Sequence, residues 1–546
     1  MKRFVLFWLI MFLVGAGAYL HAGGSWSDLI RIDQIRADIR FISDDITEGR
    51  APGTRGELIA AKYIAARMEM IGLKPLGDND TYFQRVPLIG VTTHPDARLV
   101  VRGKKGTLEF EYLKDMVAAP YVFKDVVELK DAPLVFVGYG IKAPEYQWDD
   151  FKGMDLKGKV LVMFVNDPPA TKKEPGLFEG RAMTYYGRWT YKYEEAQRQG
   201  AAGAILIHVT DMAGYPWQVV QSSWSGEQVY LDTPPKGNEL KLAAWITSEP
   251  AEKIFAMEGL KLKALLKKAA SRKFRPIPLE ATVSVTMKND LRRFKGLNVV
   301  GYVPGLDETL KAEAVVFSAH YDHLGRGQPV NGDDIYNGAF DNASGTAALL
   351  AAAEAWVRHI RAGNQPKRSA IFVAVTAEES GLLGSLYYAK YPTWPKDQLV
   401  ANLNMDGVNP FGPTHDVVPM GYDRSTLEQI VVKVARAMNL EVKPDPFPEK
   451  GYFFRSDHFS FARFGVPAIS FDSGTHYIGK PPEYGIKLQE EYVAKRYHQP
   501  SDEYDPSWPL TGARQIIEFV VRIGWEVANA PTRPVYKPGR EVKIPE

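Results

Sequence analysis

Between residues 296 and 410 the chain alternates short apolar runs with helical stretches, and this alternation constrains its fold most. The runs are NVVGYVPG, AVVFSAHYDH, SAIFVAVTAEE and VANLNMDG, with one predicted helix from Ser344 to about Arg361 and another from about residue 381. Apolar strands rich in β-branched residues are typical of a parallel sheet that is buried on both faces. The sequence therefore predicts an α/β domain, which the later run VPAISFDSG and the helix ARQIIEFVVRIGWEVAN complete.

Acidic residues and histidines gather at the ends of these runs. Most of them follow a predicted strand, one opens a helix and one lies in a late loop: His320, Asp341, Glu378, Glu379, Asp406 and His498. A parallel sheet presents its strand ends to a ligand at one edge. Two imidazoles and three carboxylates can hold two divalent metals, and one further glutamate then remains free as a base. The pattern indicates a metal-dependent hydrolase.

Two local features refine this hypothesis. Asp322, two residues after His320, can accept a hydrogen bond from the imidazole ring and fix its tautomer. Neighbours on an extended chain point in opposite directions, so we expect Glu378 and Glu379 to have different roles. Each motif alone is weak, because a lone aspartate usually caps a helix and a lone histidine is usually structural. We expect the additional histidines to support the ligands or lie in loops: His323, His458 and His476.

The chain is too long for one ordinary domain, because it has 546 residues. Two helices are predicted within residues 27–75, with a break between them at GRAPGTRG and Gly72 as the C-cap of the second. Short strands follow from about residue 95. The runs PLVFVGYGI, KVLVMFV and AAGAILIH predict a smaller α/β module. The expected division is therefore as follows: 27–124, the first part of the main domain; 125–265, the module; 285–530, the site-bearing domain; and 531–546, an extended tail.

The first 22 residues have the three parts of an export signal. Lys2 and Arg3 precede an apolar run, and a small-residue site follows, so cleavage is expected near Ala18 or Ala22. An uncleaved anchor is the alternative, because the apolar run is only a little shorter than the roughly 20 residues that span a bilayer. We expect an exported protein, periplasmic or secreted, without stable membrane insertion after cleavage.

Composition excludes several classes of function. The chain has no cysteine, which removes thiol nucleophiles, thiolate zinc sites and disulfides. Residues 1–18 hold two basic and no acidic side chains, so a chain beginning at Tyr19 would carry 65 charges of each sign. This balance argues against nucleic acid as a partner. The sequence also contains no Gly-x-Ser-x-Gly elbow and no phosphate-binding loop, so serine-hydrolase and nucleotide-binding functions lose their usual support.

The ordered motifs His-x-Asp, Asp-Asn-x-Ser-Gly, Glu-Glu, Asp-Gly and Tyr-His-x-Pro resemble those of the co-catalytic di-zinc aminopeptidases, a family that includes glutamate carboxypeptidase II. The resemblance covers about 290–530 and the N-terminal segment GRAPGTRGELIAAKYIAARMEMIGLKP. It implies the zinc-exopeptidase fold (phosphorylase/hydrolase-like), a three-layer α/β/α arrangement around a mixed sheet. The module at 125–265 resembles the protease-associated domain that is often inserted in these peptidases.

The resemblance also implies roles for the candidate residues. It implies two zinc ions per chain that Asp341 bridges, with Glu378 as the general base of a zinc-bound hydroxide. The other ligands would form one pair for each zinc: His320 with Asp406, and Glu379 with His498. Tyr452 and Tyr477 are weak candidates for the side chain that donates to the oxyanion.

These observations together predict an exported zinc exopeptidase, most simply an aminopeptidase that acts on peptides. Three alternatives remain open: a carboxypeptidase of the same family, an aminoacyltransferase of the glutaminyl-cyclase type, and a non-catalytic binding protein. A cyclase would hold one zinc rather than two. The choice between aminopeptidase and carboxypeptidase depends on which charged group lies beside the metals. Since no candidate ligand lies within 125–265, we expect the module to shape access to the site.

Overall fold

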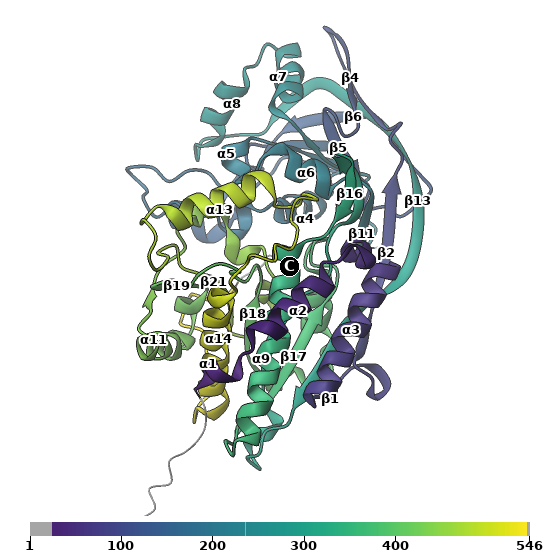
Figure 1. The fold of residues 1–546 in the computed structure, drawn as a ribbon. Coiled ribbons are helices and arrows are strands. Elements are labelled where there is room, and N and C mark those ends of the chain that lie inside the picture. Colours follow the sequence, from purple (N-terminus) through teal and green to yellow (C-terminus); the bar gives the residue numbers. More distant parts are fainter. Residues whose placement is uncertain (1–24, 235, 543–546) are drawn as a thin grey trace, which may run out of the picture.

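The computed structural model describes residues 25–234 and 236–542. The predicted export signal, residues 1–22, lies outside the described residues. Within the described residues, no helix has both the length and the apolar character that a membrane crossing requires. The chain builds two sheets that share one long strand, and Figure 1 shows the smaller unit above the larger one.

The first sheet is mixed and carries the predicted strands. Across this sheet, the strands follow the order β11 (Glu227–Leu231), β2 (Phe83–Thr93), the C-terminal half of β13 (Ile277–Val303), β17 (Ser369–Val375), β14 (Ala314–His320), β18 (Leu399–Met405), β21 (Ala468–Ser473), β19 (Asp416–Met420) and β20 (Glu441–Val442). Short β1 (Lys74–Pro75) also pairs with β13. Strands β17, β14, β18 and β21 run parallel, which confirms the predicted parallel core.

Helices cover both faces of this sheet, which confirms the three-layer α/β/α fold. One face packs against α1 (Trp26–Leu29), α2 (Ile32–Ile42), α3 (Arg55–Ile71), α9 (Ser344–Arg361), α11 (Leu427–Ala437) and α14 (Thr511–Asn529). The other face packs against α10 (Leu383–Lys390) and α12 (His458–Arg463). Helix α9 has the predicted bounds, and α3 ends as predicted at Gly72, whose φ of 98° is a left-handed conformation that glycine adopts freely.

Strand β13 belongs to a second sheet up to residue 288 and to the first sheet from residue 289 onward. The order in the second sheet is β4 (Gly106–Glu111), β3 (Arg98–Gly103), β13, β6 (Val126–Phe136), β9 (Val160–Phe164), β10 (Gly203–Ile207), β12 (Leu242–Ile246) and β5 (Met116–Ala119). Its helices are α4 (Trp189–Arg198), α5 (Thr210–Ala213), α6 (Trp217–Ser223), α7 (Ser248–Met257) and α8 (Leu262–Ala269). We call residues 94–288 the insert.

The insert is larger than the predicted module. Strands β3, β4 and β5 were expected in the main domain, yet they pair within the second sheet. Their alternating pattern predicts strands but does not say which neighbour each strand takes, because pairing with β13 is a long-range contact. The insert has its own hydrophobic core, which includes the fully buried Trp245, Phe136 and Tyr193. Strand β11 returns from the insert to the edge of the first sheet.

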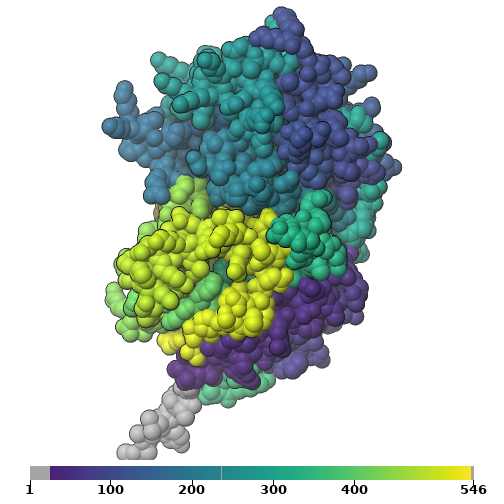
Figure 2. Space-filling view, turned by 45° about the horizontal axis from the view of Figure 1, so that its top comes forward, coloured from purple at the N-terminus to yellow at the C-terminus, as the bar shows by residue number. Residues whose placement is uncertain are grey.

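One further helix and two small hairpins add to the two sheets. Helix α13 (Tyr484–Lys495) lies between β21 and the late loop of His498, and only its Gly485 is buried. Two small hairpins complete the described chain: β7 (Lys142–Ala143) with β8 (Trp148–Asp149), and β15 (Gly325–Val330) with β16 (Asp333–Tyr336). Figure 2 shows the insert, in blue to teal, directly against the yellow C-terminal segments that include α13.

Candidate active site

The structure brings the predicted acids and histidines together at the carboxyl ends of the parallel strands. His320 Nε2 lies 3.2 Å from Asp406 Oδ1 and 3.3 Å from Asp341 Oδ1. On the other side of Asp341, its Oδ2 lies 3.4 Å from His498 Nε2, which is also 3.0 Å from Glu379 Oε2. The carboxylate of Asp341 therefore lies between two imidazoles, with one oxygen toward each.

This cluster has the donors and the charge that divalent cations require. The ligand atoms of His320, Asp341 and Glu379 all lie within 4.8 Å of one another, and so do those of His320, Glu378 and Asp406. Among the ion pairs of the described residues, these carboxylates pair only with histidines and with no lysine or arginine. A buried group of carboxylates without a lysine or arginine to balance it is costly, so the cluster fits the binding of divalent metal.

The pKa values of the two histidines also fit a cation-binding site. Burial alone would lower the pKa of His320, but the negative charges of Glu378 and Asp406 outweigh it and raise the pKa well above its ordinary value. At His498 burial also opposes the charged form, yet Glu379 and Asp341 raise the pKa to about 9. The carboxylates thus attract positive charge to the very ring nitrogens that would bind a metal.

His320 ends strand β14, and Asp322 links it to the neighbouring strand end. The ring Nδ1 lies 3.2 Å from the backbone oxygen of Asp322 and 3.7 Å from its carboxylate. The backbone oxygen is therefore nearer to the ring than the carboxylate that the sequence suggested. Asp322 Oδ1 instead accepts a hydrogen bond of 3.1 Å from the backbone N–H of Glu378. Asp322 thereby ties the loop after β14 to the turn that carries the glutamate pair.

Glu378 and Glu379 lie in a turn and not on an extended strand. Strand β17 ends at Val375, and Ala377 has a left-handed φ of 53°. The extended-chain reason for their different directions is therefore wrong, although the two side chains do have different surroundings. Glu379 Oε1 lies 2.7 Å from Nδ1 of His323, which was expected to support a ligand. Within the described residues the Glu378 carboxylate forms no hydrogen bond, and it lines the cavity described below. Burial raises the pKa of this carboxyl well above its ordinary value.

Asp341 is held through its backbone by Asp502, which sequence reasoning missed. Asp341 lies in the π-helical turn Ala339–Ala343 before α9. Asp502 accepts hydrogen bonds from the backbone N–H groups of Phe340 at 3.1 Å and Asp341 at 3.0 Å. The hydroxyl of Tyr492 donates to the same carboxylate at 3.1 Å. The position of Asp502, four residues after His498, was the available signal.

The close approach of α9 to strand β18 depends on a glycine. A Cβ atom at Gly345 would lie 2.4 Å from the backbone oxygen of Met405 and 2.1 Å from Asn342 Oδ1. Asn342 Oδ1 accepts hydrogen bonds from the backbone N–H groups of Gly345, at the start of α9, and of Gly407, which follows Asp406. This packing sets Asp341 and Asp406 beside the same imidazole.

His498 receives support from the insert. Its ring lies under the ring of Tyr497, with centroids 3.9 Å apart, and its φ is 57°. The Nδ1 atom lies 2.8 Å from the hydroxyl oxygen of Ser223, the last residue of α6. With a metal on Nε2, which faces Glu379 and Asp341, Nδ1 would carry the ring proton and donate it to the Ser223 hydroxyl. The insert therefore does more than border the site.

Arg50 forms a buried anchor beneath the site, which sequence reasoning also missed. Its side chain is fully buried and donates to four backbone oxygens, those of Tyr321 (2.6 Å), Asn337 (2.6 Å), Ile42 (2.8 Å) and Gly338 (3.1 Å). Burial lowers its pKa to about 10, a value that still keeps it charged at neutral pH. Arg50 joins the N-terminal helices to the loops of His320 and Asp341. The signal was the segment GRAPGTRG, whose Arg50 looked like part of a helix break.

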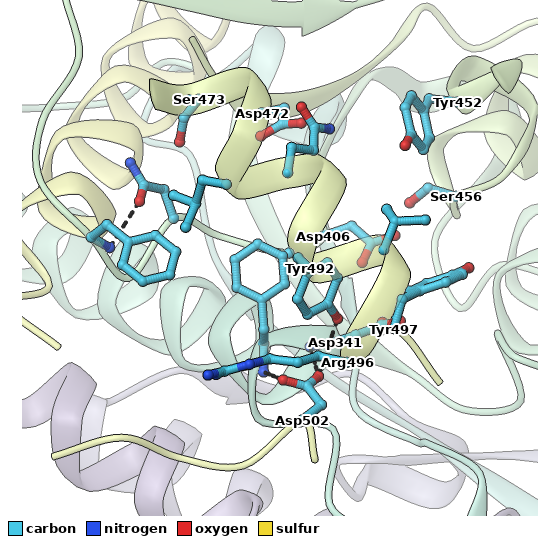
Figure 3. Close-up of a pocket in the computed structure, with 18 of the residues that line it drawn as sticks. Asp341, Asp406, Tyr452, Ser456, Asp472, Ser473, Tyr492, Arg496, Tyr497 and Asp502 are labelled. Carbon is cyan, nitrogen blue, oxygen red and sulfur yellow. Dashed lines mark hydrogen bonds between the residues drawn. The ribbon is translucent and has the colours of Figure 1, made fainter. Parts of the chain in front are cut away.

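A cavity of about 350 Å³ opens over the cluster. This is within the range of small-molecule sites. Figure 3 shows α13 crossing it, with Asp341 and Asp502 on one side and Asp472 on the other. The insert contributes Gly214 and Tyr215 to the wall. Both candidate oxyanion donors line the cavity: Tyr452 and Tyr477.

Comparison with known proteins places this geometry in a family. Residues 298–520 match the model for peptidase family M28. These residues form an M28 peptidase domain. The matched range contains every candidate ligand and the whole parallel part of the first sheet. The resemblance inferred from the motifs is therefore confirmed, whereas the protease-associated nature of the insert stays a prediction.

Two relatives of this chain differ in how much of it they match. Leupeptin-inactivating enzyme 1 of Streptomyces exfoliatus is 31% identical over 183 residues, which cover 33% of this chain and 37% of that protein. A glutamate carboxypeptidase 2 homolog of Caenorhabditis briggsae is 23% identical over 580 residues, covering 86% of this chain and 69% of the relative. The chain thus spans little more than a third of the first relative.

One solved structure shares the fold over almost the whole chain. The aminopeptidase from Aneurinibacillus sp. strain AM-1 has a TM-score of 0.54 and 19% sequence identity, with 95% of this chain and 98% of that chain covered. At this identity the similarity concerns the fold. It supports the three-layer arrangement around the M28 site.

Proposed function

We propose that this protein is an exported di-zinc exopeptidase that removes N-terminal residues from peptides. The observation that carries the proposal is Asp341, whose two carboxylate oxygens face two different imidazoles, those of His320 at 3.3 Å and His498 at 3.4 Å. A carboxylate in this position can bridge two cations. Asp406 would complete the site of His320, and Glu379 that of His498. Export rests on the N-terminal sequence pattern.

The residues of the chain then divide the chemistry between them. When bound, two zinc ions would hold the attacking water and polarise the scissile carbonyl. Glu378 lines the cavity and lies beside His320 and Asp406, so its carboxylate can accept a proton from that water and return it to the leaving amine. Tyr452 and Tyr477 remain candidates to donate to the carbonyl oxygen.

A carboxypeptidase is the second candidate, because Arg455 also lines the cavity. A guanidinium group could bind the terminal carboxylate of a peptide. Arg455, however, already donates to the hydroxyl of Tyr497 at 3.1 Å and lies over the rings of Tyr215 and Tyr452, at 5.2 and 5.3 Å from their centroids. These contacts favour a structural role, so the aminopeptidase is preferred.

The decisive assay combines metal analysis with hydrolysis of aminoacyl amides. We expect about two zinc ions per chain, release of the amine from leucyl and lysyl amidomethylcoumarins, and loss of this activity with a chelator and its return with zinc. One zinc per chain with cyclisation of N-terminal glutamine would support the cyclase alternative. Cleavage of N-blocked peptides at their C-terminus would support the carboxypeptidase, and zinc binding without any hydrolysis would support a binding protein.

The insert should affect metal affinity through Ser223. We expect Ser223→Ala to weaken zinc binding by about 10- to 100-fold, the usual effect of removing a group that orients a ligand histidine. Ser222→Ala is the matched control, because Ser222 lies next to it on α6 and its hydroxyl donates to the backbone oxygens of Gln218 and Val219. Competition with a chromophoric chelator measures both affinities. Equal affinities for the two variants would show that the insert does not support His498.

A further inference from the structure

Asp472 is a second acidic residue at the strand edge that carries the proposed metal ligands. Strands β18 and β21 run parallel, and Met405 is paired with Phe471. Asp406 and Asp472 directly follow these two residues, so they occupy adjacent positions on the two segments. The backbones of neighbouring strands lie about 4.8 Å apart. Both line the same cavity, and Figure 3 shows Asp406 between Asp472 and Asp341.

The Asp472 carboxylate has no cationic partner among the described residues. Burial raises the pKa of Asp472 to about 7, the backbone N–H of Ser473 opposes this rise, and the negative charges of Asp445 and Asp406 add to it. By contrast Glu491, on α13 at the same cavity, forms a 2.7 Å ion pair with Lys495. The Asp472 carboxylate therefore lines the cavity without a lysine or arginine partner among the described residues, and a cation bound beside it would stabilise its charged form.

Its position suits a cationic group of the substrate. In a peptide with a free N-terminus, the ammonium nitrogen lies two bonds from the scissile carbonyl carbon, at about 2.5 Å. A carbonyl held by the metals beside Asp406 would therefore bring the ammonium group to the neighbouring strand end. A lysine or arginine side chain on the same residue could reach this carboxylate from farther away.

We propose that Asp472 is a specificity-determining residue that binds a cationic group of the substrate's N-terminal residue. The inference rests on the proposed exopeptidase function and names the chemistry that this side of the cavity recognises. Two sources share that chemistry, the α-ammonium group and a basic side chain. Both would form a charge-assisted hydrogen bond with the carboxylate.

The test compares Asp472→Asn with the control Glu491→Gln. The control also removes one charge from the cavity, but from a carboxylate that is already paired with Lys495. Substrates are leucyl and lysyl amidomethylcoumarins. We expect Asp472→Asn to lower kcat/KM by about 10- to 100-fold, the scale of a lost hydrogen bond to a charged group. Glu491→Gln should leave both substrates unchanged, and zinc per chain should not change in either variant. Asp472→Glu, which keeps the charge, should recover part of the loss.

The pattern of loss distinguishes the two sources. An equal fall for both substrates identifies the α-ammonium group, and a fall for the lysyl substrate alone identifies a basic side chain. Unchanged kcat/KM for both substrates would overturn the inference. Zinc loss in Asp472→Asn would also overturn it, because Asp472 would then act on the metal site.

Ligand binding separates this inference from the proposed function. Calorimetry of the zinc-loaded protein with leucinamide, lysinamide and their N-acetyl forms does not depend on hydrolysis. Suppose that the wild type hydrolyses neither substrate, and that Asp472→Asn binds leucinamide or lysinamide more weakly than the wild type does. This result would uphold the inference and reject the exopeptidase. If the wild type hydrolyses the substrates and Asp472→Asn equals it in binding and activity, the exopeptidase is upheld and the inference is rejected.

Discussion

Replacing Glu378 by glutamine is expected to lower kcat by about 10²- to 10⁴-fold while zinc stays bound, the usual contribution of a positioned acid–base group. Glutamine keeps the size of the side chain and one oxygen, but it cannot accept the proton of the attacking water. Among the residues that the structure describes, Glu378 has no side-chain hydrogen bond and lines the cavity, whereas Glu379 contacts His323 at 2.7 Å and His498 at 3.0 Å. The proposed base is thus separable from the proposed ligand.

The measurement is kcat on an aminoacyl amide beside zinc per chain by elemental analysis. Glu379→Gln is the matched comparison, because it makes the same chemical change one residue along. It should lower zinc content, since it removes a charge that faces His498. Should Glu378→Gln lose zinc while Glu379→Gln keeps it, the two roles would have to be exchanged.

Replacing Asp341 by alanine should act on the metals themselves. Its two oxygens face His320 and His498 and would offset the repulsion between two cations, so its removal affects both sites at once. We expect zinc per chain to fall from about two to below one, with activity lost and not restored by moderate added zinc. Asp502 is not free to replace it, because its carboxylate is already engaged with the backbone N–H groups of Phe340 and Asp341.

Asp502→Asn should give a milder form of the same defect. It keeps the bridging carboxylate but weakens the hydrogen bonds that hold its backbone, so zinc should bind more weakly rather than be lost. Equal zinc content in Asp341→Ala and the wild type would refute the bridging role, even if the protein hydrolyses peptides. Thermal unfolding of each apo-protein, followed by circular dichroism, shows whether a loss of zinc reflects the site or the fold.

Local sequence determined the strand ends of the site-bearing domain. Apolar β-branched runs predict β14, β17 and β18, because a strand that is buried on both faces of a sheet is apolar along most of its length. Helix α9 was predicted with its observed bounds, and the capping glycine of α3 was read directly from the sequence. A parallel sheet places its carboxyl ends at one edge, so the clustering of His320 and Asp406 followed from the order of these elements.

Tertiary structure alone decided what surrounds those strand ends. Ser223 meets His498 across 275 positions of the chain, and Arg50 reaches the backbone of Tyr321 across 271. Nothing in the local pattern of either residue predicts such a contact, because it depends on how the insert and the N-terminal helices pack. The pairing of β3 with β13 has the same cause. Local patterning selects strands, helices and the side chains at their ends, whereas the partners of those side chains come from long-range packing that no short segment encodes.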